Sequence, residues 1–84
     1  MTQARLRRVE LGEEVLNEFA FSQFRVRDHD GLARVEVAPS ELEKLFTPSM
    51  LSIVTQRLLG VGYDRVTFDF NGYRPAGLRQ NAIT

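Results

Sequence analysis

The alternation of apolar and polar positions predicts that the chain begins with an amphipathic helix. Over residues 5–19 apolar side chains recur at helical spacing, and acidic side chains occupy the opposite side. The apolar face consists of Leu6, Val9, Leu16 and Phe19, with Leu11 and Val15 beside it, and the polar face of Glu10, Glu13, Glu14 and Glu18. Such a helix buries one side and leaves the other in water.

Residues from about 23 to 37 predict two strands joined by a tight turn at Asp30-Gly31. A primed hairpin turn needs positive φ, which glycine adopts without steric cost. Side chains alternate between two faces, and the polar face carries Arg25, Arg27, Arg34 and Glu36. A two-residue loop places Arg27 opposite Arg34 and Arg25 opposite Glu36, whereas a four-residue loop places Arg25 opposite Arg34. Either register keeps these polar residues together.

The next segment predicts helical structure that is either continuous or broken once. Ser40 and Glu43 fit a capping box, while Thr47-Pro48 fits an N-cap followed by proline at the first helical position. The buried stripe of this helix is predicted to be Leu51, Val54 and Leu58, flanked by Met50 and Ile53, and Gly60 is its expected end.

A third strand is predicted at residues 63–70, followed by a turn at Asn71-Gly72. Its apolar side consists of Val66, Phe68 and Phe70, and its polar side of Arg65, Thr67 and Asp69. The order helix, strand, strand, helix, strand predicts an α+β fold, a two-layer sandwich of a three-stranded sheet with an antiparallel hairpin beneath the helices. We expect residues 1–84 to be one domain, with an ordered core at about 5–74 and a mobile tail at 75–84.

Composition excludes several classes of function. The chain has 84 residues, 43% of them hydrophobic, which is ordinary for a globular domain. Its net charge is zero, so no strong overall field attracts nucleic acid or an acidic membrane. It has no cysteine, which excludes disulfides, thiolate metal sites and a cysteine nucleophile. No apolar run approaches the roughly 20 residues that span a bilayer. We therefore expect a cytoplasmic protein that binds neither nucleic acid nor membrane.

The candidate chemistry lies on the polar face of the predicted sheet. Arginine supplies ten of the eleven basic residues, and its planar guanidinium suits carboxylate and phosphate. Arginines that face each other repel unless an anion or a carboxylate lies between them. The sequence thus predicts an anion-binding site formed by Arg25, Arg27, Arg34, Glu36, Asp69 and Arg74, with Thr67 among them. The alternative is a solvated face with weak salt bridges.

Other polar and aromatic residues give weaker signals. His29 is expected to be an exposed turn residue, and the tyrosines and phenylalanines are assigned mostly to the core. The sequence contains no glycine-rich phosphate loop, catalytic triad or paired metal motif. We therefore assign no catalytic residue, metal or cofactor to this chain and do not expect it to be an enzyme on its own.

Three separated blocks lie within about residues 5–74: Arg25-Val26-Arg27, Leu32-Ala33-Arg34-Val35-Glu36-Val37 and Val66-Thr67-Phe68-Asp69-Phe70-Asn71-Gly72-Tyr73-Arg74. In this order they resemble the carboxy-terminal domain of the ATP-dependent sacrificial sulfur transferase family. That family belongs to the pyrophosphatase-loop superfamily and makes the nickel-pincer nucleotide cofactor. The chain departs from the family pattern at Ala20 and after Arg74, where Pro75-Ala76-Gly77 follows.

The resemblance implies a division of labour between domains. Family members use an amino-terminal pyrophosphatase-loop domain, with ATP and Mg²⁺, to adenylate a carboxylate on a nicotinate-derived mononucleotide, and a cysteine then gives up its sulfur. Neither that loop nor any cysteine is present here. The resemblance places Arg25, Arg27, Glu36 and Arg74 near the substrate phosphate and the subunit contacts, and it implies homo-oligomers.

Two functions therefore remain open. The first is a non-catalytic domain that binds a phosphorylated or carboxylated small molecule and acts with a separate pyrophosphatase-loop ATPase domain. The second is a purely structural homo-oligomerisation module, in which Arg25 of one subunit pairs with Glu36 of another.

Overall fold

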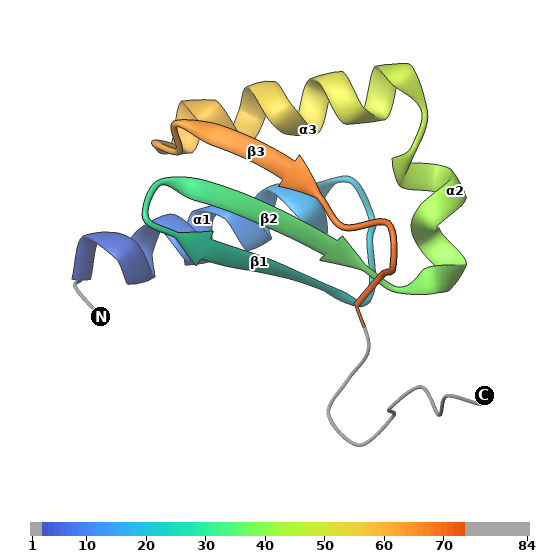
Figure 1. Ribbon diagram of the computed structural model, residues 1–84, viewed down its shortest axis with the longest axis horizontal. Coiled ribbons are helices and arrows are strands. Elements are labelled where there is room, and N and C mark those ends of the chain that lie inside the picture. Colours follow the sequence, from blue (N-terminus) through green and yellow to red (C-terminus); the bar gives the residue numbers. More distant parts are fainter. Residues whose placement is uncertain (1–2, 74–84) are drawn as a thin grey trace.

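The computed structural model describes residues 3–73, and Figure 1 shows a three-stranded sheet with helices on one side. The elements follow in the order α1 (Gln3–Glu18), β1 (Phe24–His29), β2 (Leu32–Val37), the 3₁₀ turn η1 (Pro39–Glu41), α2 (Leu42–Leu45), α3 (Pro48–Val61) and β3 (Arg65–Phe68). This order confirms the predicted α+β class and the break in the second helical region. The predicted mobile tail at 75–84 lies outside the described residues.

The hairpin closes through a two-residue turn, which decides between the two predicted registers. Asp30 and Gly31 have φ of 56° and 96°, as a primed turn requires. Arg27 therefore pairs with Arg34, and Arg25 with Glu36. The φ of Gly31 strains any other residue, and a Cβ there would also lie 2.7 Å from the Asp64 carboxylate, so glycine suits this position best.

The same turn also starts the third strand. The Gly31 carbonyl accepts the backbone N–H of Asp64 at 2.8 Å and that of Arg65 at 3.3 Å. From there β3 runs parallel to β2, so the sheet order is β1-β2-β3. The central strand β2 is therefore fixed on both sides near one turn.

The core lies between one face of the sheet and the two long helices (Figure 1). It is formed by Val15 and Leu16 of α1, Val26 of β1, Ala33, Val35 and Val37 of β2, Val54 and Leu58 of α3, and Phe21, Leu45 and Tyr63 between elements. Helices α1 and α3 pack against each other above these residues. The opposite face of the sheet, which carries the predicted polar set, has no helix over it among residues 3–73.

Several details of the helices differ from the sequence prediction. Helix α1 covers Gln3–Glu18, and Leu6 is exposed because this first turn presents Arg5 and Arg8 to the hairpin. The predicted capping box at Ser40 and Glu43 is wrong. Neither η1 nor α2 has a side-chain N-cap, because the chain enters α2 directly from the 3₁₀ turn.

The third helix begins as predicted but ends later. Thr47 Oγ1 accepts the Met50 N–H at 3.2 Å, and Pro48 occupies the first helical position. Gly60 does not end the helix. The helix continues to Val61, and Gly62 occupies the C-cap position with a φ of 126°, which glycine tolerates. In the predicted stripe Val54 and Leu58 are buried, and Leu51 is half-buried.

The third strand is shorter than predicted, and its last apolar residue is not buried. Residues 65–68 form the strand, with Arg65 and Thr67 exposed and Val66 and Phe68 half-buried, as the alternation predicts. Phe70 is 72% exposed because the chain has already left the sheet at a turn. No helix in residues 3–73 is long and apolar enough to cross a membrane.

The burial of Val35 gives a test of the assigned faces. Val35 is fully buried on β2, so Val35→Asp places a charge in the core and should abolish the cooperative unfolding transition. Thr67→Asp is the matched control, because Thr67 is exposed on the neighbouring strand. It should unfold with a midpoint close to that of the wild type. Urea unfolding followed by circular dichroism makes the comparison, and a native-like Val35→Asp protein would show that the faces are reversed.

Candidate functional site

The bare face of the sheet holds three guanidiniums around one carboxylate, and we call Arg25, Arg27, Arg34 and Glu36 the arginine cluster. Glu36 lies in the middle of it on β2. Its Oε1 accepts from Arg27 Nε at 3.3 Å, and its Oε2 accepts from Arg34 Nε at 3.1 Å. Arg34 Nη2 also lies 3.1 Å from Oε2. The carboxylate thus holds together two arginines that the hairpin register places directly opposite each other.

The carboxylate of the cluster is buried, whereas the guanidiniums that it binds are partly exposed to solvent. Glu36 is only 6% exposed, whereas the side chains of Arg27 and Arg34 are 46% and 41% exposed. The negative charge is therefore covered and the positive groups reach solvent. Three guanidiniums and one carboxylate leave a formal excess of two positive charges on this face. This arrangement presents a positive surface to an approaching anion.

The third arginine of the cluster is held from another direction. Arg25 Nη2 donates to the Tyr73 hydroxyl at 3.4 Å, and its guanidinium lies 5.5 Å from the centre of the Tyr73 ring. This hydrogen bond raises the pKa of Arg25. Tyr73 is itself fixed by its N–H, which donates to the Val37 carbonyl at 2.6 Å. We expected Tyr73 in the core, but it is half-buried beside the cluster.

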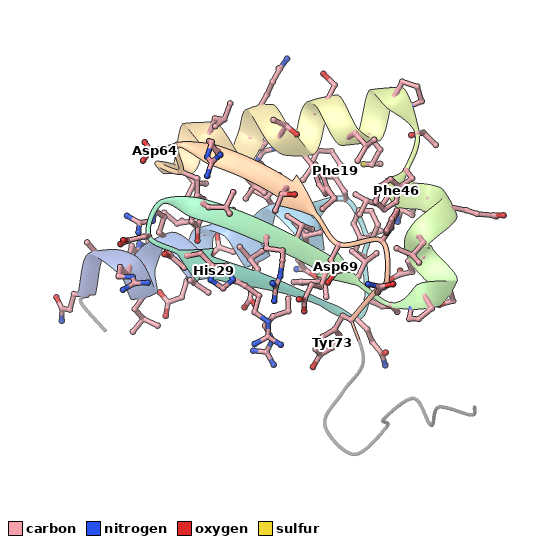
Figure 2. The ribbon with its side chains drawn as sticks, viewed as in Figure 1. Phe19, His29, Phe46, Asp64, Asp69 and Tyr73 are labelled. Atoms are coloured by element: carbon pink, nitrogen blue, oxygen red, sulfur yellow. The ribbon has the colours of Figure 1, made fainter. Side chains whose placement is uncertain are left out.

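The other predicted site residues either make no side-chain hydrogen bond or ion pair with the arginine cluster within residues 3–73 or lie outside the described residues. Thr67 pairs with Arg34 on the neighbouring strand. Asp69 follows β3 (Figure 2). Its Oδ1 accepts the Asn71 N–H at 2.8 Å. Among the described residues its carboxylate contacts no arginine and instead shapes the turn. Its place in the anion site stays a prediction. Arg74 lies outside the described residues. His29 is exposed at the end of β1, as expected.

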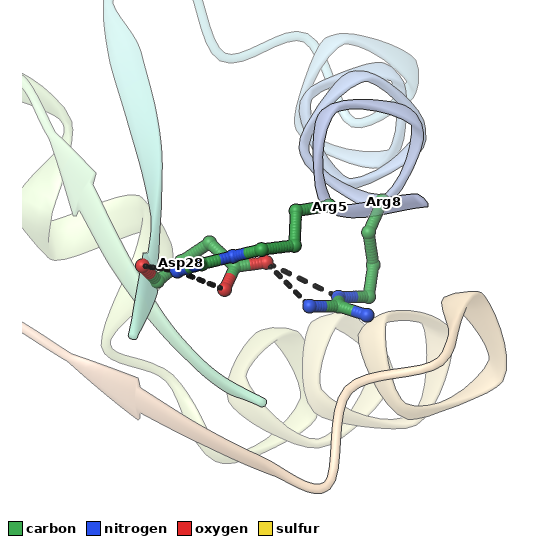
Figure 3. A network of polar contacts seen from close by, with 3 residues as sticks. All are labelled: Arg5, Arg8 and Asp28. Atoms are coloured by element: carbon green, nitrogen blue, oxygen red, sulfur yellow. Dashed lines mark hydrogen bonds and ion pairs between the residues drawn. The ribbon is translucent and has the colours of Figure 1, made fainter. Parts of the chain in front are cut away.

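A second carboxylate, which sequence reasoning missed, holds two arginines on the other side of the hairpin. Asp28 lies on the helix side of β1, and its side chain is 2% exposed. Its Oδ2 accepts from Arg8 Nε at 3.1 Å and Nη2 at 3.0 Å, and its Oδ1 accepts from Arg5 Nη2 at 3.3 Å (Figure 3). This network, Arg5, Arg8 and Asp28, joins the first turns of α1 to the hairpin.

The network shifts the pKa values of its members. Burial alone raises the pKa of Asp28, but the hydrogen bonds and charges of Arg8 and Arg5 outweigh it, and the net shift is downward. The same contact with Asp28 raises the pKa of Arg8. Tyr63 lies beneath the Arg8 guanidinium, which is 5.2 Å from its ring centre. Burial, with the nearby charge of Asp28, raises the pKa of Tyr63 to about 12.

A signal for this network was present in the sequence. Asp28 alternates in phase with Phe24 and Val26, so a carboxylate falls on the apolar side of the strand. A charge in that position needs a partner. Arg5 and Arg8 are three residues apart and therefore share one side of a helix. Reading these two facts together would have predicted the contact.

A groove of about 320 Å³ lies between α1 and α3, away from the arginine cluster. Its apolar lining includes Leu11, Val15 and Val61. Its charged residues are Glu14, Glu18 and Arg57, and the single cation Arg57 already pairs with Glu18 at 2.7 Å. The arginine cluster therefore remains the stronger candidate for binding an anion.

Comparison with known proteins shows that the chain is similar to part of a longer protein. No protein-family model matches the chain. It is 30% identical over 80 residues, 95% of its length, to the uncharacterized protein slr1717 of Synechocystis sp. (strain ATCC 27184 / PCC 6803 / Kazusa). The chain spans 30% of the length of that protein.

The Asp28 network predicts a pH-dependent contribution to stability. Asp28→Asn removes the charge that Arg5 and Arg8 share, and should lower the free energy of unfolding at pH 7 by about 2 kcal/mol. Because the pKa of Asp28 is lowered in the folded state, its contribution is complete above the ordinary carboxyl pKa of about 4 and is lost as the pH falls further. Urea unfolding of both proteins between neutral and acidic pH measures this difference.

Glu10→Gln is the control for that series. Glu10 is exposed and lies 3.7 Å from Arg7, so its loss should change stability by less than about 0.5 kcal/mol. Equal stability of wild type and Asp28→Asn at neutral pH, or a gap that widens on acidification, would contradict the role assigned to Asp28.

Proposed function

We propose that this chain is an anion-binding domain that holds a phosphate- or carboxylate-bearing nucleotide on its arginine cluster. The observation that carries the proposal is the buried Glu36, which fixes Arg27 and Arg34 side by side on the face of the sheet that no helix of residues 3–73 covers. Side chains held on strands by a carboxylate lose little further freedom when they bind a ligand.

The hydrogen-bonding capacity of the cluster supports an anionic ligand. Arg27 uses only its Nε for Glu36, and within residues 3–73 its two terminal nitrogens have no protein partner. These nitrogens can donate to two oxygens of one phosphate or carboxylate, the geometry in which arginine binds anions most strongly. Two further arginines lie next to Arg27. Arg34 pairs directly opposite it on β2, and Arg25 lies two residues before it on β1.

We further propose that the domain is the substrate-side part of a sulfur transferase of the ATP-dependent sacrificial type. The three blocks that carry the resemblance include every member of the arginine cluster. A relative in which a segment like this chain forms 30% of the length supports a domain that works beside others. In this proposal a pyrophosphatase-loop domain, on a partner or on the rest of a longer chain, supplies ATP, Mg²⁺ and the adenylation step.

The role of this chain in that reaction is to bind and orient. The sequence has no cysteine to donate sulfur and no glycine-rich loop to hold ATP. The cluster would hold the phosphate of the mononucleotide and leave the carboxylate that reacts pointing toward the other domain. Charge neutralisation at the phosphate and loss of ligand freedom are the two contributions that this chain makes.

The experiment is a thermal-shift titration of the full chain with phosphate, pyrophosphate, AMP and nicotinic acid mononucleotide. A ligand that binds only the folded state raises the midpoint of thermal unfolding. Arg27→Ala should keep the fold, because the side chain lies on the bare face, and should weaken binding by about 1.5–3 kcal/mol.

Arg7→Ala is the matched control, since it removes the same charge from an exposed position on α1. It should bind like the wild type. The nucleotides should stabilise the protein more than inorganic phosphate does. Absence of any shift in the wild type, or equal weakening by Arg27→Ala and Arg7→Ala, would contradict a specific site.

A further inference from the structure

The two edge strands of the sheet, β1 and β3, differ in whether side chains bind their outward backbone groups. The β1 edge is closed by side chains of α1: Glu13 Oε2 accepts the outward Val26 N–H, and Arg5 Nη2 donates to the outward Asp28 carbonyl, each at 3.4 Å. Side chains that occupy the backbone groups of an edge strand prevent another strand from pairing there. Two of the outward backbone groups of β1 are thus already used within the chain, which makes this edge less suited to pairing with another strand.

The β3 edge has no such protection. The backbone N–H groups of Arg65 and Asp69 point to β2, where they donate to the Gly31 and Val35 carbonyls. The intervening residues Val66 and Phe68 therefore direct their N–H and C=O groups to the outside of the sheet. In the part of the chain that the structure describes, no strand and no side chain pairs with them.

Apolar side chains that are partly or largely exposed lie on β3 and next to its end. Val66 and Phe68 are half-buried, and Phe46 and Phe70 are 39% and 72% exposed. The Phe46 ring lies 6.3 Å from that of Phe68 and 6.4 Å from that of Phe70, so the three aromatic rings form one patch at the end of β3. Figure 2 shows Phe46 on this side of the molecule. Clustered exposed aromatics mark contact surfaces more often than single exposed residues do.

We propose that a second copy of this chain pairs with the β3 edge, antiparallel and about a two-fold axis, to make a continuous six-stranded sheet. The outward groups allow Val66 of one copy to face Phe68 of the other, with Thr67 facing Thr67 across the axis. In that register Arg65 of each copy lies opposite Asp69 of the other. Opposite charges directly across from each other stabilise an antiparallel pair.

The charges single out this register. A shift of two residues in one direction places Thr67 opposite Asp69 of the second copy, and a shift in the other places Arg65 opposite Thr67. Neither pairs a cation with an anion. The strand is therefore complementary to itself, which favours a second copy over an unrelated partner. Asp69 can accept Arg65 of that copy through Oδ2, because only its Oδ1 is used by Asn71.

This interface is separate from the arginine cluster. Within its own chain Glu36 already binds Arg27 and Arg34, and Arg25 binds Tyr73. The cluster therefore remains exposed when two copies join through β3. Assembly and anion binding can be tested, and can fail, independently.

Charge reversal provides a test that folding defects cannot imitate. Arg65→Glu places two carboxylates opposite each other at both ends of the pair, and Asp69→Arg does the same with two guanidiniums. Each variant alone should dimerise about tenfold or more weakly than the wild type. In an equimolar mixture Glu at 65 meets Arg at 69 and the native pair forms at the other end, so the mixture should dimerise again. Sedimentation velocity of the full chain over a concentration series measures this.

Arg7→Glu is the control, because it makes the same charge change on the exposed side of α1 and should dimerise like the wild type. Hydrogen exchange gives a second readout, in which the Val66 and Phe68 amides should become protected as the protein concentration rises. A wild type that stays monomeric at all concentrations would overturn the proposal. So would dimerisation that Arg65→Glu leaves unchanged, or single variants that stay monomeric when mixed.

Discussion

The two-residue turn at Asp30-Gly31 is the constraint on which the other contacts depend. It sets the register of β1 against β2, and thereby places Arg27 opposite Arg34 with Glu36 two residues away. It also points Asp28 toward α1, and its Gly31 carbonyl binds the first residues of β3. A one-residue slip would turn the side chains of one strand to the other face of the sheet, so Arg27 and Arg34 would no longer share a face. The fold, the arginine cluster and the open edge thus share one origin.

The hairpin carries two buried carboxylates, and they serve different purposes. Asp28 faces the helices, where Arg8 donates two hydrogen bonds to it and also packs over the Tyr63 ring. That network is enclosed, and its charges are used within the fold. Glu36 faces the bare side, where it fixes the bases of two guanidiniums whose ends reach solvent. Removing one partner of a buried pair costs stability, but an exposed guanidinium held in place is available to a ligand.

Sequence patterns predicted the class of fold, the hairpin and the bare polar face, because alternation and turn residues act over a few positions. They left the hairpin register open between two alternatives, which only the backbone of Asp30 and Gly31 decides. Contacts between distant segments were missed, as with Arg8 and Asp28, twenty residues apart. Phe70 was misplaced because the strand ends before it, and the end of a strand depends on its neighbours and not on its own alternation.

The central claim is that the arginine cluster, and not arginine in general, binds an anion. The most direct measurement is a titration of the full chain with inorganic phosphate, followed through the Nε–Hε signals of the individual arginines by NMR. The account predicts that the signals of Arg27 and Arg34 move along one saturating curve, while those of Arg5 and Arg8, held by the buried Asp28, stay in place. Signals that do not move, or that all move alike without saturation, would contradict it.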